Sequence, residues 1–160
     1  MVGHQGMMNR RYPERPIVGV AAIIFRGDEV LLVQRGREPA YGQWSLPGGL
    51  VKVGEELHQA VRREVLEEVG LQVEVMDVVA VLDRILYDRE GRIEYHYVLV
   101  DFLCGFSGGE PVPASDVLDC RFVPISLLSQ VPLTRGTADV IASALETVQG
   151  AHPPIYVPGS

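Results

Sequence analysis

Three glutamates, Glu64, Glu67 and Glu68, are spaced so that they would share one side of a helix. Over residues 55–69 apolar residues recur at helical spacing, and on the helical wheel Glu64 and Glu68 fall inside the apolar sector while Glu67 lies at its edge. At about 4 Å and an effective dielectric near 20, each pair of carboxylates would repel by roughly 4 kcal/mol. A cation must offset this repulsion, and hard carboxylate oxygens favour Mg²⁺ or Mn²⁺. The alternative is a solvated acidic helix, which would not place carboxylates on its apolar side.

A glycine loop leads into this helix. Leu46-Pro47-Gly48-Gly49 combines the fixed φ of proline with two glycines that let the backbone approach a ligand closely. Gly54 is expected as the N-cap, and Gly70 is expected to end the helix in the left-handed conformation. We therefore expect a loop and a helix that together form a binding site for a charged ligand.

Residues 49–71 resemble the Nudix box, G-x5-E-x7-R-E-U-x-E-E-x-G-U, where U is an aliphatic residue. Every fixed position matches, in the order Gly49, Glu55, Arg63, Glu64, Val65, Glu67, Glu68, Gly70 and Leu71. The resemblance implies metal-dependent hydrolysis of a nucleoside diphosphate linked to a further group, with water attacking phosphorus. It also implies that Glu64, Glu67 and Glu68 are metal ligands or the base and that the Gly49 carbonyl is a further ligand. Glu55 and Arg63 would brace the box through an ion pair.

The rest of the chain predicts strands alternating with helices. Strands are expected at residues 17–25, 30–35, 73–86, 95–102 and 120–124, with a Gly27-Asp28 turn joining the first two. A short helix is expected after Ser126, and a longer one over residues 138–147, capped by Thr134 or Thr137. Residues 106–115 hold too many glycines and prolines for a regular element and are expected to form a loop. This α/β pattern predicts a mixed β-sheet between helices, in agreement with the α/β/α sandwich that the Nudix resemblance implies.

Length and composition predict one globular domain. The chain has 160 residues, 47% of them apolar and 22% charged. We expect a flexible tail over residues 1–15, a single Nudix hydrolase domain over 16–149 and coil over 150–160. The net charge of −7 argues against a nucleic-acid surface, and an acidic protein that binds pyrophosphate needs metal between the two. No secretory signal precedes the first strand and no apolar run is long enough for a membrane helix, so we expect a cytoplasmic protein with free, buried thiols at Cys104 and Cys120.

Several residues outside the box are candidates for binding the substrate. Arg35, followed by Arg37, ends a strand beside the glycine loop, where a guanidinium could hold phosphate oxygens at two points. Glu110 and Asp116 could reach a metal or the attacking water if their loop folds over the cleft. Trp44 is expected to pack behind the glycine loop rather than stack on a base. His96 is expected to be a strand residue without a catalytic role.

Beyond the box, residues 95–102, 108–111 and 116–119 resemble the short Nudix proteins called ADP-ribose pyrophosphatases. ADP-ribose, cleaved to AMP and ribose 5-phosphate, is therefore the first expected substrate. Tyr87, sixteen positions after Leu71, is instead similar to a tyrosine of diadenosine-polyphosphate hydrolases, and nucleoside triphosphates are a further alternative. A non-catalytic nucleotide sensor is the competing class, although a sensor should have a damaged box. The expected partner is a small nucleotide, and a homodimer through sheet edges or loops is compatible with the sequence.

Overall fold

Strand β1, Ile17–Arg26, is the centre of the fold, and the computed structural model describes residues 9–150, 156, 158 and 159. Successive β1 side chains point to opposite faces of the sheet. Val20, Ala22 and Ile24 pack in one core cluster, whereas Ala21, Ile23 and Phe25 pack in or against the other. The strand expected at residues 17–25 is therefore present, and it is buried on both faces.

The elements follow in the order β1, β2 (Glu29–Arg35), β3 (Trp44–Ser45), β4 (Gly48–Leu50), α1 (Leu57–Val69), β5 (Val73–Tyr87), β6 (Ile93–Phe106), β7 (Val117–Pro124), the 3-10 helix η1 (Ile125–Gln130) and α2 (Thr137–Gln149). The sheet order is β3-β2-β1-β6-β5, with β4 paired to β1 and β7 to β2. Strands β1 and β6 run parallel, and the other pairs are antiparallel. The sheet is therefore mixed, as the sequence predicted.

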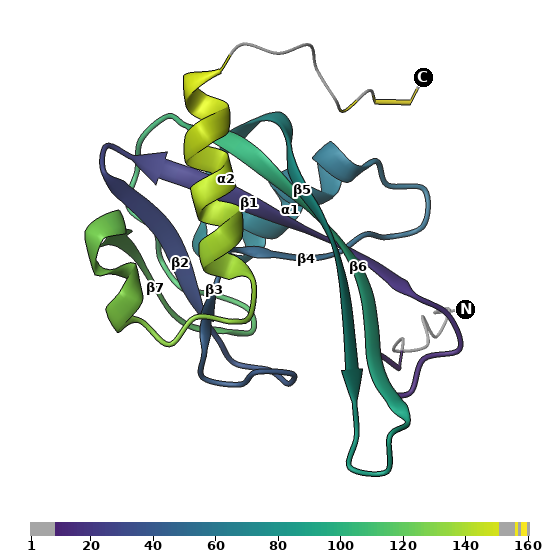
Figure 1. The fold of residues 1–160 in the computed structure, drawn as a ribbon. Coiled ribbons are helices and arrows are strands. Elements are labelled where there is room, and N and C mark those ends of the chain that lie inside the picture. The colour runs from purple at the N-terminus through teal and green to yellow at the C-terminus, as the bar shows by residue number, and fades with distance from the viewer. Residues whose placement is uncertain (1–8, 151–155, 157, 160) are drawn as a thin grey trace.

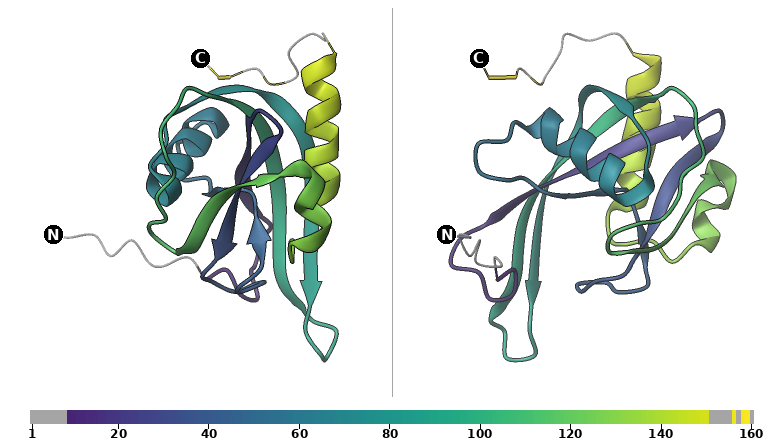
Figure 2. Two further views of the ribbon diagram at one scale, coloured as in Figure 1. Left: turned by 90° about the vertical axis from the view of Figure 1, so that its left-hand side faces the viewer. Right: turned by 180° about the vertical axis from the view of Figure 1, so that it is seen from behind.

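Helices α1 and α2 cover opposite faces of this sheet (Figure 1; Figure 2, left). Ala60, Val61, Val65 and Val69 of α1 pack in one cluster, and Val140, Ile141 and Ala144 of α2 pack in the other. This arrangement confirms the α/β/α sandwich. The hairpin of β5 and β6 extends beyond the body of the domain.

The ends of the helices differ in part from the sequence expectations. Glu56, not Gly54, is the N-cap of α1, and the Gln59 side chain accepts a hydrogen bond from the Glu56 amide at 2.9 Å. The Glu56 side chain in turn accepts a hydrogen bond from the Gln59 amide, and this capping box takes the place of the expected glycine cap. Gly70 ends α1 with φ of 70°, which confirms its expected role.

The N-caps expected for the two later helices are wrong. The 3-10 helix η1 begins after Pro124 rather than Ser126, and Gly136 is the N-cap of α2. Thr134 and Thr137 instead hydrogen bond each other through their hydroxyl oxygens at 2.6 Å. At the start of α2 no side chain makes a capping hydrogen bond.

The loop between β6 and β7 confirms the expected irregular segment and is tied to α1. The Val112 amide donates to the Val69 carbonyl at 3.0 Å, and the Ala114 amide donates to the Glu68 carbonyl at 2.9 Å. Carbonyls at the end of a helix have no partner within the helix. The loop therefore satisfies two of the last carbonyls of α1.

Several other expectations can be compared with the structure. Cys104 and Cys120 are buried free thiols, and Trp44 packs in the core beneath the Arg121 guanidinium, 4.7 Å from its ring centroid. Residues 1–8 of the expected tail, and most of the expected coil after residue 150, lie outside the described residues. Among those that are described, neither α1 nor α2 is long and apolar enough to cross a membrane.

The expected glycine loop is a strand in the structure. Gly48 and Gly49 belong to β4 and pair with Ala21 and Val20 of β1. A Cβ atom at Gly48 would lie 2.0 Å from the Val20 carbonyl oxygen, which belongs to the backbone and cannot turn away. Only glycine therefore fits at position 48.

We predict that Gly48→Ala lowers the free energy of unfolding by at least about 2 kcal/mol, because it forces β4 away from β1. Urea unfolding measures the change. Gly105→Ala on β6 is the matched control, since its Cβ would meet nothing closer than 3.7 Å. Equal stability of the two variants would contradict the steric argument.

Candidate active site

The carboxylates of α1 line a cavity between this helix and β4, which we call the carboxylate cavity. Glu64 and Glu68 are partly buried, whereas Glu67 is exposed, as their places on the helical wheel indicated. The cavity is lined chiefly by Arg35, Lys52, Arg63, Glu64, Glu67, Glu68 and Asp116, with the backbone of Gly48 and Gly49. Strand β4 and helix α1 thus bring together the main residues of the Nudix-like stretch.

Arg63 binds both its expected partner Glu55 and two carboxylates of the cavity. Its Nε and one terminal nitrogen donate to the two Glu55 oxygens at 2.7 and 2.9 Å. The other terminal nitrogen donates to Glu64 at 2.7 Å and to Glu67 at 3.2 Å. A fifth hydrogen bond reaches the Leu50 carbonyl at 2.9 Å. The planar guanidinium therefore fixes Glu64 and Glu67 relative to β4.

These contacts shift the pKa values of both ionic partners. The hydrogen bonds that Arg63 donates to Glu55 lower the pKa of Glu55 and raise the pKa of Arg63 further above its usual value. Both shifts favour the charged forms of the two side chains. The brace that the box resemblance implied is present as a bidentate pair.

Glu68 and Glu64 lie against the two glycines of β4. The Gly48 amide donates to a Glu68 oxygen at 3.0 Å. A Cβ atom at Gly49 would lie 2.3 Å from the Glu64 carboxyl carbon, so any side chain there would displace this carboxylate. Burial of Glu68, together with the nearby Glu64 charge, raises the pKa of Glu68 to about 8 although the Gly48 amide opposes the shift.

The residues fit a divalent cation by their donor chemistry. Glu64, Glu67 and Glu68 offer only hard carboxylate oxygens, which suit Mg²⁺ or Mn²⁺. The raised pKa of Glu68 shows that its negative charge is poorly compensated in this protein, and a cation would supply the missing compensation. Within the described residues, no three His, Cys, Asp or Glu side chains already form a coordinating group. Metal binding would therefore require these side chains to adjust.

The structure brings two of the four further candidates to this cavity. Arg35 and Asp116 line it, and the Arg37 guanidinium binds Asp116 at 2.6 Å. Tyr87 is 62% exposed at the end of β5, and Glu110 lies 3.7 Å from Arg26 at the end of β1. Neither Tyr87 nor Glu110 lines this cavity or the one that adjoins it.

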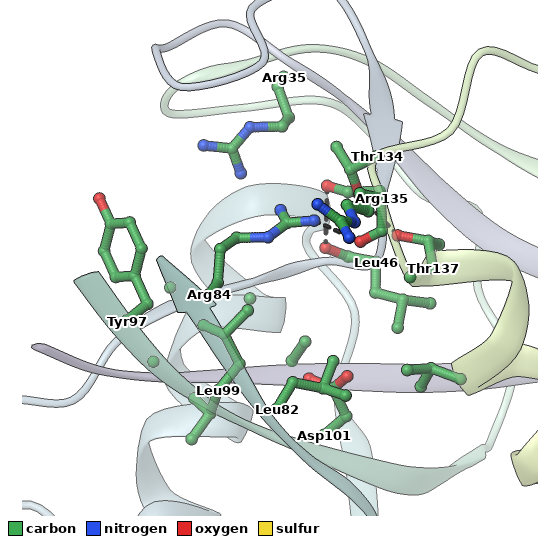
Figure 3. Close-up of a pocket in the computed structure, with 18 of the residues that line it drawn as sticks. Arg35, Leu46, Leu82, Arg84, Tyr97, Leu99, Asp101, Thr134, Arg135 and Thr137 are labelled. Carbon is green, nitrogen blue, oxygen red and sulfur yellow. Dashed lines mark hydrogen bonds between the residues drawn. The ribbon is translucent and has the colours of Figure 1, made fainter. Parts of the chain in front are cut away.

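The adjoining cavity lies on the sheet beside α2, and we call it the arginine cavity (Figure 3). It is lined by Arg10, Arg35, Arg84 and Arg135, by Asp101, and by apolar residues including Leu46, Leu82 and Leu99. Figure 3 shows Arg35, Arg84 and Arg135 converging from three parts of the chain. Arg84 also donates a hydrogen bond to the Arg135 carbonyl.

Sequence reasoning missed Arg10, Arg84 and Asp101. Asp101 had a visible signal, because it is the one charged residue in the apolar run of residues 97–103. Arg84 is likewise a lone cation within a largely apolar strand. Arg10 had no such signal, because the residues next to it in the sequence do not indicate that it lies beside residues distant in the chain.

We predict that Arg63→Lys lowers kcat by about tenfold or more, because an ammonium with three donors cannot bind Glu55 at two points and also hold Glu64 and Glu67. A change of tenfold corresponds to about 1.4 kcal/mol in the barrier. Steady-state kinetics and Mn²⁺ titration measure the effect, and circular dichroism checks the fold. Unchanged kinetics would show that the brace does not orient the carboxylates.

We predict that Asp101→Asn stabilises the protein in a pH-dependent way. Burial raises the pKa of Asp101 to about 6, although Arg84 opposes the shift. The folded protein therefore binds this proton more tightly than the unfolded chain, so this group's contribution to stability is full below about pH 4 and is lost as the pH rises towards 6.

The gain from Asp101→Asn should grow over that range to about 2–3 kcal/mol at pH 7. Urea unfolding between pH 4 and 7 measures it. Asp83→Asn, which alters an exposed carboxylate on β5, should not reproduce the gain. A difference from wild type that is independent of pH would contradict the burial argument.

Comparisons with known proteins agree with this fold and site. Residues 15–144 match the family model of the NUDIX domain. The chain is 51% identical over 142 residues to the putative 8-oxo-dGTP diphosphatase 2 of Mycobacterium tuberculosis, a match that covers 86% of this chain and 94% of that protein. It is 32% identical over 116 residues to the ADP-ribose pyrophosphatase of Methanocaldococcus jannaschii, covering 72% of this chain and 66%, just under two thirds, of that protein.

A solved structure gives the same result. The MutT NUDIX hydrolase from Burkholderia pseudomallei superimposes with a TM-score of 0.71 at 32% identity, covering 81% of this chain and 98% of that one. The matched region includes the whole carboxylate cavity except Arg10. The chain therefore belongs to the Nudix hydrolase family.

Proposed function

We propose that this Nudix hydrolase cleaves a pyrophosphate bond of a nucleotide with the help of Mg²⁺ or Mn²⁺. The observation that carries the proposal is the arrangement of Glu64, Glu67 and Glu68 in one cavity, with Glu64 and Glu67 held by Arg63. Cations on the other side of the same cavity, Arg35 and Lys52, suit an anionic substrate. Carboxylates for a metal and cations for phosphate thus face one space.

Glu64, Glu67 and Glu68 are the residues that would hold the cation, with the Gly49 carbonyl as a further ligand. Once bound, the cation would stabilise charge that develops on the phosphate and lower the pKa of a water molecule. Arg63 keeps two of the carboxylates in place, and the Gly48 amide keeps the third. Arg35 is fixed by donating from Nε to the Pro39 carbonyl at 2.8 Å, which leaves its terminal nitrogens for phosphate oxygens.

We place nucleoside triphosphates first among the substrates. The relative of 51% identity bears a name for that activity, and the match covers nearly all of both chains. Two cavities that share Arg10 and Arg35 also suit a ligand with several phosphates. ADP-ribose, our first expectation from the sequence, is the second candidate and is supported by the relative of 32% identity.

Four other expectations are weaker or stay as predictions. The exposed Tyr87 lies outside both cavities and gives no support for a dinucleoside polyphosphate. An intact box argues against a sensor without catalysis. A homodimer and a cytoplasmic location remain predictions.

The experiment that tests the function is a substrate panel. Purified protein is incubated with the common nucleoside triphosphates, 8-oxo-dGTP, ADP-ribose and a dinucleoside polyphosphate, with Mg²⁺, with Mn²⁺ and with excess chelator. We expect metal-dependent release of a nucleoside monophosphate from at least one of them. Full activity in chelator, or no hydrolysis of any compound, would refute the proposal.

We predict that Glu67→Gln and Glu68→Gln each lower turnover by at least about a hundredfold, or roughly 2.7 kcal/mol in the barrier. Each change removes a charge that would bind the cation and orient the water. Without metal the variants should be no less stable than wild type, because Glu67→Gln relieves repulsion between carboxylates and Glu68, with a pKa raised to about 8, is already largely neutral at pH 7. Turnover, Mn²⁺ affinity and thermal unfolding in chelator measure these effects.

Glu146→Gln is the matched control. It removes one glutamate charge from an exposed position on α2, the helix on the opposite face of the sheet. Its turnover and Mn²⁺ affinity should equal those of wild type. If the control and the α1 variants behave alike, the carboxylate cavity is not the metal site.

A further inference from the structure

Arg10 lines both the carboxylate cavity and the arginine cavity. It precedes β1 and lies outside residues 15–144, which match the family model. Its side chain is partly buried. Within the described part of the chain, its guanidinium makes no hydrogen bond or ion pair, although Arg63, Arg35 and Arg84 all do. Arg10 is thus a cation at the junction of two cavities with its donors unused.

The two residues after Arg10 hold it in this place. Arg11 binds the Glu94 carboxylate at 2.8 Å, and the Tyr12 amide donates to the Glu94 carbonyl at 2.8 Å. The Tyr12 hydroxyl donates to Asp88 at 2.7 Å. Glu94 and Asp88 belong to the hairpin of β5 and β6 and the turn between these strands. We call the contacts of Arg11 and Tyr12 with this hairpin the N-terminal clasp.

The clasp holds the backbone in an uncommon conformation. Tyr12 has φ of 54°, in the left-handed region that residues other than glycine rarely adopt. Such a conformation persists when surrounding contacts fix it. The Glu94 carbonyl holds the Tyr12 amide, and Asp88 holds the Tyr12 hydroxyl. The Asp88 side chain is only 7% exposed and also binds Arg92 at 2.8 Å. Arg10 therefore reaches the cavities from a fixed segment.

The charges around Arg10 indicate an anionic ligand. Burial lowers the pKa of Arg35, and the nearby charges of Arg84 and Arg10 lower it further, although Tyr97 and Glu68 oppose the shift. Arg135 lies in the same cavity. Like charges held together in a partly buried site destabilise one another until an anion binds among them. In a protein with a net charge of −7, such a concentration of arginines requires an explanation.

We propose that Arg10 binds phosphate oxygens of the nucleotide where the two cavities meet, and that the N-terminal clasp positions it to do so. The inference rests on the proposed pyrophosphohydrolase function and adds a residue from outside the family domain to the substrate site. Arg10 would bind the phosphates on the side away from Glu64, Glu67 and Glu68, together with Arg35. The N-terminal segment is then part of the active site.

Arg10→Ala should raise KM by about tenfold or more, the loss of one or two hydrogen bonds to a charged group. Because Arg10 binds phosphate without touching the attacked bond, kcat should change by less than about threefold. Arg10→Lys should recover part of the loss by restoring the charge. The measurement is steady-state kinetics with the best substrate of the panel.

Arg15→Ala is the matched control, because it removes the same charge from an exposed residue of the same segment. Its KM should equal that of wild type. An unchanged KM in Arg10→Ala, or an equal rise in Arg15→Ala, would overturn the assignment of Arg10 as a binding residue.

The clasp is tested by Tyr12→Phe, which removes only the hydroxyl that binds Asp88. This variant should raise KM by about two- to fivefold, consistent with the loss of a hydrogen bond to a charged group. In the Arg10→Ala background the same change should have no further effect, because the clasp acts through Arg10. Additive effects of the two changes would overturn the positioning role.

A binding measurement separates this inference from the proposed function. Calorimetric titration with inorganic pyrophosphate in Mg²⁺ should show affinity weakened by about tenfold or more in Arg10→Ala, the same loss expected for KM. If wild type hydrolyses no compound of the panel but binds pyrophosphate through Arg10, the proposed function fails and the binding role stands. If wild type is active and Arg10→Ala binds pyrophosphate as tightly, the binding role fails and the function stands.

Discussion

The close approach of α1 to the paired strands β1 and β4 is the constraint on which the site depends. Gly48 leaves no room for a side chain against Val20, and Gly49 leaves none against Glu64. Because the two glycines are so close to the helix, the Gly48 amide can reach Glu68, and Arg63 can reach the Leu50 carbonyl. A side chain at position 48 would force β4 away from β1, and one at position 49 would displace the Glu64 carboxylate. The same contact thus sets both the packing of the core and the position of the carboxylates.

The carboxylate cavity and the arginine cavity hold clusters of opposite charge, and the charges in the two cavities are offset in different ways. At α1, the charges of Glu55, Glu64 and Glu67 are offset by the single guanidinium of Arg63. In the arginine cavity, Asp101 is the one acidic residue among the described residues that line it beside Arg10, Arg35, Arg84 and Arg135. Burial raises the pKa of Asp101 to about 6, so near neutral pH this carboxylate is mostly ionised but offsets only one of the arginines. A ligand with a metal at one end and phosphates along its length would compensate both parts together.

Much of this architecture could be predicted from local patterns. The apolar alternation of β1, the Gly27 turn and the Gly70 helix end depend on neighbouring residues, and each was confirmed. The position of Glu64 and Glu68 on the buried side of α1 also follows from helical spacing. The expected cap at Gly54 is wrong because the actual cap depends on a hydrogen bond from the Glu56 amide to the Gln59 side chain, and a sequence does not show the rotamer that makes this bond.

The second half of the site depends on contacts between distant residues. Arg10, Arg35, Arg84 and Arg135 come from four separated parts of the chain and meet only because β1, β2, β5 and the segment before α2 adjoin. Strand β4 was expected to be a loop because its glycines lack the side chains that usually mark a strand in a sequence. Backbone pairing with β1 makes it a strand instead. Glu110 was chosen for its loop, but the path of that loop takes it towards Arg26 instead.

The segment between β6 and β7 is rich in glycine and proline, and such segments commonly tolerate changes of length. Here the backbone amides of Val112 and Ala114 donate hydrogen bonds to carbonyls in the last turn of α1. The Gly36 amide donates to the Asp116 carbonyl at 2.9 Å. Between these fixed points the number of residues cannot change without releasing a carbonyl of the helix that carries Glu68. Room for insertion is therefore confined to residues 107–111, before the first tether, so length variation among related chains should concentrate there.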